Sequence, residues 1–231
     1  MKLPLSARLQ ACAGFVRPGD RVADIGCDHG YLGIHLLTQG IAASVISADI
    51  NEGPLQSAVR NSVKFGVRDR MTFYLSNGVQ SIPRDFDTMV CAGMGGDTMV
   101  SILEAAPWMK DSRYRMILQC QSKTPLLRQY LSAGGWHIAR ETILRDGRFL
   151  YTVMEVFWQP EHPRLTVGEC WFPPALLENP GPETAEYYRR LRDGLALAVA
   201  HGEQGEKAQA LAYLEGLASV PEQQWLKEDT K

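Results

Sequence analysis

The sequence contains no uninterrupted run of about 18 apolar residues, the length that a membrane-spanning helix requires. It has only five cysteines, an odd number, and none of them forms a Cys-x-x-Cys pair. Scattered cysteines are typical of reduced thiols in a cytosolic protein and argue against a disulfide framework or a zinc site. Arg8 and Gln10 stand where a secretory signal peptide needs apolar residues. We therefore expect a cytoplasmic protein without a membrane span or a bound metal.

The chain also lacks a strong excess of charge of one sign, since its formal net charge is −2. The charge is unevenly distributed. Residues 1–160 carry 17 Lys and Arg against 14 Asp and Glu, whereas residues 161–231 carry 7 against 12. A mildly basic first part permits a polyanionic partner there but does not require one.

Short apolar runs alternate with segments of helical periodicity over the first 160 residues. The predicted strands are 21–26, 44–49, 71–76, 86–93 and 114–119, and the predicted helices are 5–16, 31–39, 54–65, 97–105 and 125–133. Two further strands, 136–144 and 148–158, are joined at Asp146-Gly147 as a hairpin. This order predicts an α/β fold, with a mostly parallel seven-stranded sheet covered by helices on both faces.

The pattern changes near residue 160, where the proline-rich segments 159–164 and 171–182 predict connectors. Residues 183–201 and 205–218 then predict two helices, with Gly202 and Gly205 in the turn between them. We therefore expect two domains, 1–160 and 161–231, of which the second is an α-helical hairpin.

The first strand-to-helix turn of a doubly wound sheet is the usual place for a cofactor. Here it reads Asp24-Ile-Gly-Cys-Asp-His-Gly30, and a Gly-x-Gly-x-x-Gly dinucleotide motif would need glycine where the chain has Asp28. A carboxylate at that position would crowd and repel a pyrophosphate, so a nicotinamide oxidoreductase is the least favoured function. S-adenosylmethionine carries two cationic groups and no phosphate, and therefore suits Asp24 and Asp28, while Gly26 and Gly30 let the backbone approach the ligand.

An acid at the end of the second strand would hold the ribose hydroxyls of such a cofactor. Asp49 lies 23 residues after Gly26, close to the interval expected for that carboxylate. The alternative is that Asp49 caps the following helix. Asn77-Gly78 follows the third strand, where methyltransferases contact adenine, but Asn-Gly is also a common turn.

Three motifs together resemble the TrmK family of bacterial tRNA methyltransferases. They are Leu-Ser-x-Arg-Leu at 5–9, Asp-Ile-Gly-x-Asp-His-x-Tyr-Leu at 24–32 and Ala-Gly-Met-Gly-Gly at 92–96. The resemblance implies a Rossmann-like class I fold and methylation of N1 of adenine 22 in the D-arm of tRNA, with S-adenosylmethionine as the donor. It extends over nearly the whole chain. The family often has Leu-Gln-Pro-Asn after the fifth strand, where this chain has Leu-Gln-Cys-Gln at 118–121.

Methyl transfer to adenine N1 forms a cationic product, so a nearby carboxylate would stabilise the developing charge. We expect this catalytic group to be Asp28 or, as second candidate, Asp97. The cofactor should lie against Asp24, Gly26, Asp28, Gly30, Asp49, Asn77, Gly78, Ala92 and Gly93. The target base should enter over Met94, Gly95 and Gly96, although a plain turn is the alternative there.

The remaining substrate candidates are Arg8, Tyr31, Arg60 and Lys64. Arg60, Lys64 and Arg68 repeat every four residues and could present one basic helix face to RNA, or be a solvated surface. For Tyr31 and His29 packing roles are favoured, and Cys27 lacks a base that would make it a nucleophile. We expect a monomer that binds tRNA. The alternatives are a methyltransferase with a small-molecule or protein acceptor, and a non-catalytic RNA-binding protein with a bound cofactor.

Overall fold

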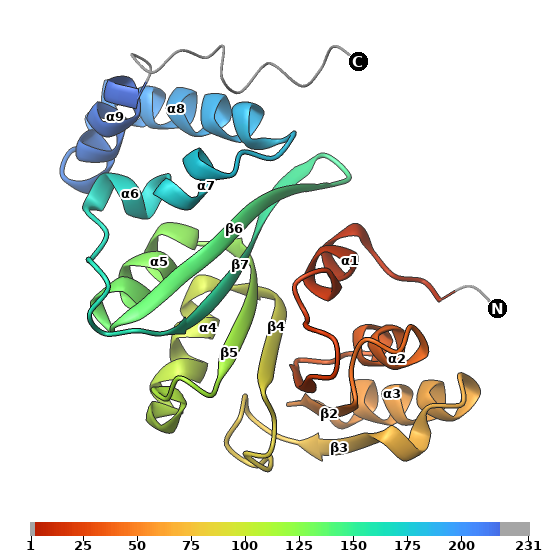
Figure 1. The fold of residues 1–231 in the computed structure, drawn as a ribbon. Coiled ribbons are helices and arrows are strands. Elements are labelled where there is room, and N and C mark those ends of the chain that lie inside the picture. The colour runs from red at the N-terminus through yellow and green to blue at the C-terminus, as the bar shows by residue number, and fades with distance from the viewer. Residues whose placement is uncertain (1–2, 218–231) are drawn as a thin grey trace.

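A computed structural model describes residues 3–217 of the chain, and its centre is one seven-stranded sheet (Figure 1). The strands are β1 (Arg21–Ile25), β2 (Ser44–Asp49), β3 (Met71–Leu75), β4 (Thr88–Gly95), β5 (Arg115–Ser122), β6 (Trp136–Asp146) and β7 (Phe149–Trp158). Their order is β3-β2-β1-β4-β5-β7-β6, and β7 runs antiparallel to both of its neighbours. The predicted fold class is confirmed, with the hairpin at the edge of an otherwise parallel sheet.

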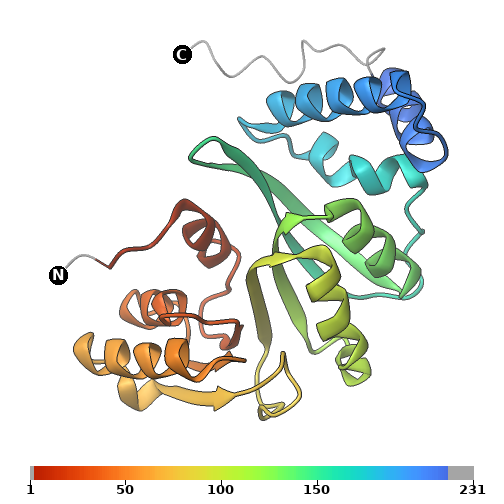
Figure 2. The ribbon, with the colours of Figure 1, turned by 180° about the vertical axis from the view of Figure 1, so that it is seen from behind.

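Helices cover both faces of the sheet (Figures 1 and 2). One face packs against α1 (Ala7–Ala13), α2 (Tyr31–Thr38) and α3 (Glu52–Lys64), and the other against α4 (Gly96–Glu104) and α5 (Thr124–Ala133). Two 3-10 turns, η1 (Arg68–Arg70) and η2 (Pro107–Met109), lie in the connections. Side chains alternate between the faces: in β1, Val22 packs on the α1–α2 side and Ala23 on the α4–α5 side. Asp24 therefore points to the side of α1 and α2.

β4 is longer than the sequence predicts. It extends through Gly95, with a register shift against β5 between Ala92 and Met94. Gly93 has a φ of 83°, which lets the strand bulge at this point and then continue. Met94 and Gly95, expected in a loop, thus lie at the end of a strand.

Four helices follow the sheet: α6 (Val167–Trp171), α7 (Pro174–Glu178), α8 (Thr184–Ala200) and α9 (Glu206–Leu217). The predicted helical pair is present as α8 and α9, and the Tyr188 hydroxyl donates to the carbonyl of Leu214 at 2.8 Å. The prediction of a connector over 171–182 is wrong at Pro174–Glu178, because Pro174 occupies the first turn of α7. The sequence also did not predict α6, for which Thr166 forms a capping box. Residues 218–231 of the expected second domain lie outside the described residues.

The C-terminal helices share a small core with the β6–β7 hairpin. Ile143 of β6 belongs to the same apolar cluster as Phe172, Leu176 and Tyr188. The buried Arg128 of α5 adds a polar link, because it pairs with Glu141 of β6 and donates to the carbonyl oxygens of Cys170 and Trp171 at 2.9 and 3.0 Å. A boundary at residue 160 stays a prediction.

Candidate active site

A cavity of about 280 Å³ opens at the carboxyl ends of β1 and β4. Its lining combines α1, the end of β1, the β1–α2 loop, the start of α2, the end of β4 and one residue of β5. The lining residues are Arg8, Leu9, Asp24, Gly26, Cys27, Asp28, His29, Tyr31, Leu32, Ala92, Gly93, Met94 and Gln121. Segments more than 100 residues apart in the sequence therefore meet around the loop that the sequence nominates as the cofactor site.

Asp24 supplies a buried carboxyl group to this cavity. Its side chain is 4 % exposed, and Oδ2 finds no hydrogen-bond partner among residues 3–217. Burial raises the pKa of Asp24 to about 7, an N–H bond from Gly33 opposes that rise, and the charge of Asp49 adds to it. An unpaired buried carboxyl oxygen is costly unless a ligand completes it, and the complementary ligand is a cation that donates hydrogen bonds.

The loop after β1 makes two sharp turns around Asp28. Gly26 and Gly30 both have a φ of 71°, and Asp28 itself has a φ of 49°. A side chain at Gly26 would meet the Met94 methyl group at 2.3 Å, and one at Gly30 would meet Ala58 of α3 at 2.9 Å. Gly26 keeps the cavity open beside Met94, whereas Gly30 allows α3 to pack against the loop.

Asp49 joins this loop to the end of β2. Its carboxylate is 8 % exposed and accepts the backbone N–H of Asp28 at 3.1 Å and that of Asn51 at 2.9 Å. Each carboxylate oxygen has a second lone pair, so Asp49 can accept donors from a ligand as well. Asp49 does not line the cavity described above, but it borders the cavity through Asp28.

Asn77 and Gly78 lie beyond Asp49 at the same edge of the sheet. The carbonyl of Asp49 accepts the N–H of Ser76, which places residues 76–78 next to the end of β2. Asn77 is exposed, and Gly78, with a φ of 57°, packs against Ile102 of α4. Neither residue lines the cavity, and their assignment to the cofactor stays a prediction.

Arg8 enters the cavity from α1 and is held in place from three sides. Its Nε donates to Asp146 at 3.0 Å and its Nη1 to the side-chain oxygen of Gln119 at 3.2 Å, while its guanidinium lies 5.8 Å from the Tyr151 ring centre. The same Gln119 oxygen accepts the N–H of Gly93 at 2.9 Å. Gln119 thus couples Arg8 to the bulge in β4. In the sequence, Gln119 is a polar residue that ends an apolar strand, and it keeps the glutamine of the Leu-Gln-Pro-Asn pattern.

Asp28 and the two rings beside it are at the open side of the cavity. The Asp28 carboxylate is exposed and lies 3.6 Å from Nε2 of His29, and the ring centres of His29 and Tyr31 are 5.7 Å apart. Cys27 is buried, and burial raises the pKa of its thiol well above the usual range. A thiol kept protonated in this way is unsuited to nucleophilic attack.

The second catalytic candidate, Asp97, is not among the residues that line the cavity. It lies at the start of α4 and pairs with Lys123 at 2.7 Å, which holds the pKa of Asp97 below its usual range. Gly96 is buried, and a side chain there would come within 2.5 Å of the Lys123 carbonyl. The continuation of β4 through Gly95 is the reason that these residues diverge from Gly93 and Met94.

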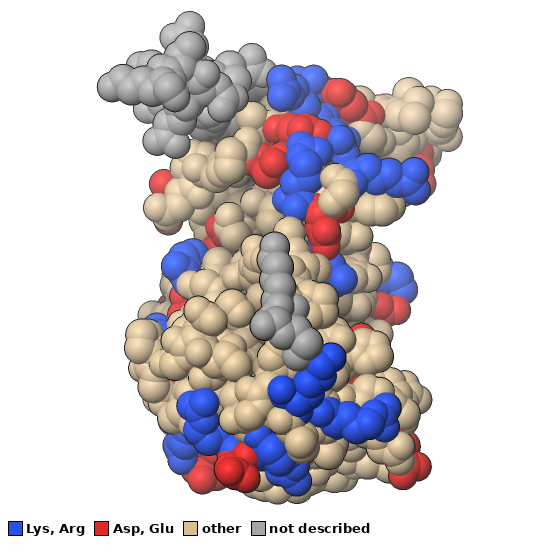
Figure 3. Space-filling model, turned by 90° about the vertical axis from the view of Figure 1, so that its right-hand side faces the viewer, with Lys and Arg blue, Asp and Glu red and all other residues tan. Residues whose placement is uncertain are grey.

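Arg60 and Lys64 are exposed on α3, away from the cavity lining. Arg68 and Arg70 instead donate to the main-chain carbonyls of Met71 and Leu37. Figure 3 shows Lys and Arg side chains gathered in two places on this side of the molecule, one at the end that carries α2 and α3 and one near the C-terminal helices. Acidic side chains lie among both groups.

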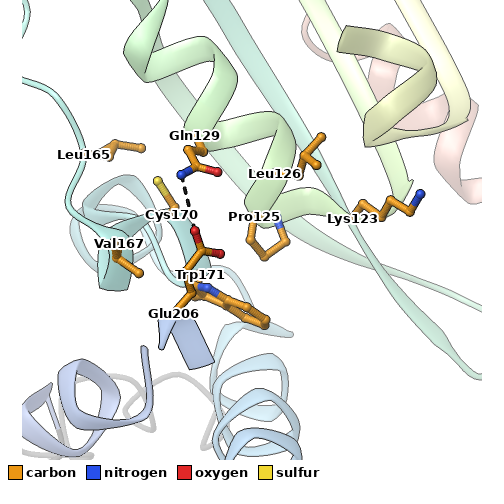
Figure 4. A pocket seen from close by; sticks show the side chains of 9 residues that line it. All are labelled: Lys123, Pro125, Leu126, Gln129, Leu165, Val167, Cys170, Trp171 and Glu206. Atoms are coloured by element: carbon orange, nitrogen blue, oxygen red, sulfur yellow. Dashed lines mark hydrogen bonds between the residues drawn. The ribbon is translucent and has the colours of Figure 1, made fainter. Parts of the chain in front are cut away.

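A second cavity of about 270 Å³ lies between α5 and the C-terminal helices (Figure 4). Leu126, Leu165, Val167 and Trp171 give it apolar walls, and Gln129 bonds Glu206 across it at 3.5 Å. None of the nominated site residues lines it. Within residues 3–217 no cluster of three or more His, Cys, Asp or Glu side chains could hold a metal, and no helix there is long and apolar enough to cross a membrane.

Comparisons with known proteins agree with this geometry. The family described as "methyltransferase domain" matches residues 5–154. A tRNA (adenine(22)-N(1))-methyltransferase of Bacillus subtilis is 32 % identical over 154 residues, an alignment that spans 66 % of this chain and 65 % of that relative.

Solved structures match over more of the chain. A Streptococcus pneumoniae protein in complex with S-adenosyl-L-methionine, described as a candidate tRNA (m1A22) methyltransferase, is 27 % identical and has a TM-score of 0.82, covering 92 % of this chain and 99 % of that one. A Streptococcus agalactiae protein of the NADB-Rossmann superfamily is 31 % identical, with a TM-score of 0.79 over 94 % and 95 % of the two chains. The chain therefore belongs to the methyltransferase domain family, and its resemblance to the TrmK family is confirmed.

Proposed function

We propose that this protein transfers a methyl group from S-adenosylmethionine to N1 of adenine 22 in the D-arm of tRNA. The observation that carries the proposal is the unpaired, buried carboxyl oxygen of Asp24 in a cavity bordered by Asp28 and Asp49. The named Bacillus subtilis relative supplies the acceptor and the position of the methyl group.

The residues around the cavity fit the cofactor. Oδ2 of Asp24, which has no hydrogen-bond partner within residues 3–217, is suited to a cationic group of the cofactor, and the turn at Gly26 leaves room above the backbone. Asp49 retains lone pairs for the two ribose hydroxyls. The cofactor, when bound, supplies an electrophilic methyl group on a sulfonium. The protein's part is to hold that group and the attacking nitrogen in line.

The acceptor adenine must leave its stack in the folded RNA before N1 can approach a buried methyl group. Tyr31 and Arg8 line the mouth of the cavity, where one offers an aromatic face and the other a cation. Methylation places a positive charge on the base. Asp28 is the exposed carboxylate of the cavity, so it stabilises that charge or accepts the N6 proton.

The same proposal includes the cytoplasm as the place of action, because tRNA is the substrate, and a monomer as the active form.

The test is mass spectrometry of tRNA nucleosides after incubation with the protein and S-adenosylmethionine. We expect 1-methyladenosine in a tRNA with adenine at position 22 and none in the same transcript with guanine there. Methylation of another atom or position, or labelling of a metabolite or protein instead of tRNA, would contradict the proposal.

A further inference from the structure

We propose that Arg8, Arg148, Phe149 and Tyr151 form a stacking surface for the unpaired nucleotides beside the methylated adenine. We call these four residues the hairpin platform. The inference rests on the proposed function and concerns how the same site holds its RNA.

The β6–β7 hairpin extends past the other strands, between α1 and α8 (Figures 1 and 2). Its register pairs Leu144 with Tyr151 and Asp146 with Phe149, and cross-strand partners share a face. Leu144 packs in the core cluster that contains Cys12 and Ala13 of α1, as does Val153, two residues after Tyr151. Phe149 and Tyr151 therefore continue the face that α1 covers, outward to the tip.

The opposite face of the hairpin is closed by the C-terminal helices. Ile143 and Leu150 pack there, and Arg145 bonds Glu183 of the segment before α8 at 2.6 Å. Arg190 of α8 donates to the carbonyl of Arg148 at 3.2 Å. These contacts support the hairpin from one side and leave its other side available.

The open face presents aromatic rings and cations together. Phe149 is 50 % exposed, and its ring centre lies 6.0 Å from that of Tyr151. The Arg148 guanidinium lies 4.9 Å from the Phe149 ring centre, and that of Arg8 lies 5.8 Å from the Tyr151 ring centre. An exposed phenylalanine at a hairpin tip lowers solubility. Phe149 with Arg148, and Tyr151 with Arg8, are suited to a partner that is both flat and anionic.

Arg8 connects the platform to the cavity. It lines the cavity with Gly93, and its bond to Asp146 ties it to the hairpin tip. When an adenine is drawn into the cavity, its neighbours along the strand lose their own stacking partner. These neighbouring bases can stack on Phe149 and Tyr151 instead, while the two arginines of the platform pair with the phosphates. Unpaired RNA therefore matches this surface in shape and charge.

The test compares Phe149→Ala and Phe149→Trp with the wild-type protein in steady-state methylation of tRNA. Leu197→Ala serves as the matched control, because Leu197 is an exposed apolar residue of α8, 61 % exposed, outside the platform. We expect Phe149→Ala to raise the KM for tRNA by about 5- to 100-fold, the range for loss of one stacked base. Phe149→Trp and Leu197→Ala should stay near the wild-type value, and the affinity for S-adenosylmethionine should be unchanged in all of them.

A second readout uses tRNA with 2-aminopurine next to position 22. Stacking on the platform should quench its fluorescence with wild-type protein and not with Phe149→Ala. Equal KM values for Phe149→Ala and Leu197→Ala would overturn the platform while leaving the methyltransferase intact. So would a dimer in sedimentation that Phe149→Ala dissociates without changing the kinetics. Absence of tRNA methylation by the wild-type protein would instead contradict the proposed function itself.

Discussion

The backbone N–H of Asp28 donates a hydrogen bond to the carboxylate of Asp49 at 3.1 Å. This bond joins the loop after β1 to the end of β2, the two places that a class I methyltransferase needs for the two ends of its cofactor. Asp49 therefore supports the loop, and under the proposed function it also holds the ribose of the cofactor.

Asp49→Ala removes both functions. We expect binding of S-adenosylmethionine to weaken by about 100-fold, or ~3 kcal/mol, since hydrogen bonds to a charged group are lost. Titration calorimetry measures the change. Asp69→Ala is the control, because Asp69 is an exposed acid of η1. Unchanged affinity in Asp49→Ala would remove Asp49 from the cofactor site and leave the helix-capping role.

We expect the buried carboxylate of Asp24 to lower the stability of the folded protein and to strengthen binding of the cofactor. Because burial raises the pKa of Asp24 to about 7, the folded protein holds a proton that the unfolded chain releases near pH 4. The free energy of unfolding therefore falls as the pH rises from about 4 to 7 and levels off above the folded pKa. Asp24→Asn removes this penalty.

We expect the ligand-free Asp24→Asn protein to be more stable than wild type at pH 8, by about 4 kcal/mol, with little difference at pH 4. Denaturant unfolding at the two pH values measures this. Wild-type affinity for S-adenosylmethionine should rise as the pH passes 7, because only the carboxylate pairs with a cation, and Asp24→Asn should lose both the affinity and its pH dependence. A variant that binds as tightly as wild type would contradict the assignment.

Local patterns sufficed to predict the sheet, and they failed where a residue's role depends on a distant partner. The inner strands are covered by helices on both faces, so short apolar runs between turn residues indicated them. The short helices α6 and α7 were missed because the prolines in the segments around them are typical of helix breakers, although Pro174 begins a helix. Prolines at the first turn of a helix and in a loop have the same local signature.

The same distinction applies to the candidate site, where residues close together in the sequence were predicted and a residue with distant partners was missed. Asp24 and Gly26 lie in one loop with Asp28, and the sequence sufficed to nominate them together. Gln119 was missed as a site residue because its partners, Gly93 and Arg8, are 26 and 111 residues away. Asp97 looked adjacent to the base-entry loop, but the extension of β4 carries it to Lys123. No local feature reports how far a strand continues through glycines.

The buried pair of Arg128 and Glu141 predicts how firmly the C-terminal helices are attached. Both side chains are fully buried, and Arg128 also donates to two carbonyls of α6. Arg128→Met leaves Glu141 charged and unpaired, so we expect the free energy of unfolding to fall by about 3–5 kcal/mol. Combining it with Glu141→Leu should recover most of the loss, as measured by denaturant unfolding. Equal stability of Arg128→Met and wild type would contradict a coupled pair.

The two acidic candidates for catalysis differ in their surroundings, and this separates them experimentally. Asp28 lines the cavity, whereas Asp97 is paired with Lys123 outside the lining. We expect Asp28→Ala to lower kcat for tRNA methylation by about 100-fold, the lower end for a positioned acid–base group. Asp97→Ala should lower it less than about threefold, because an exposed ion pair contributes little. Single-turnover methylation with saturating cofactor measures both, and Asp28→Asn, which keeps the side chain's size, distinguishes lost charge from a loosened loop. If Asp97→Ala lowered kcat more than Asp28→Ala does, the catalytic acid would be Asp97 of α4, and the base would approach from the side of Lys123.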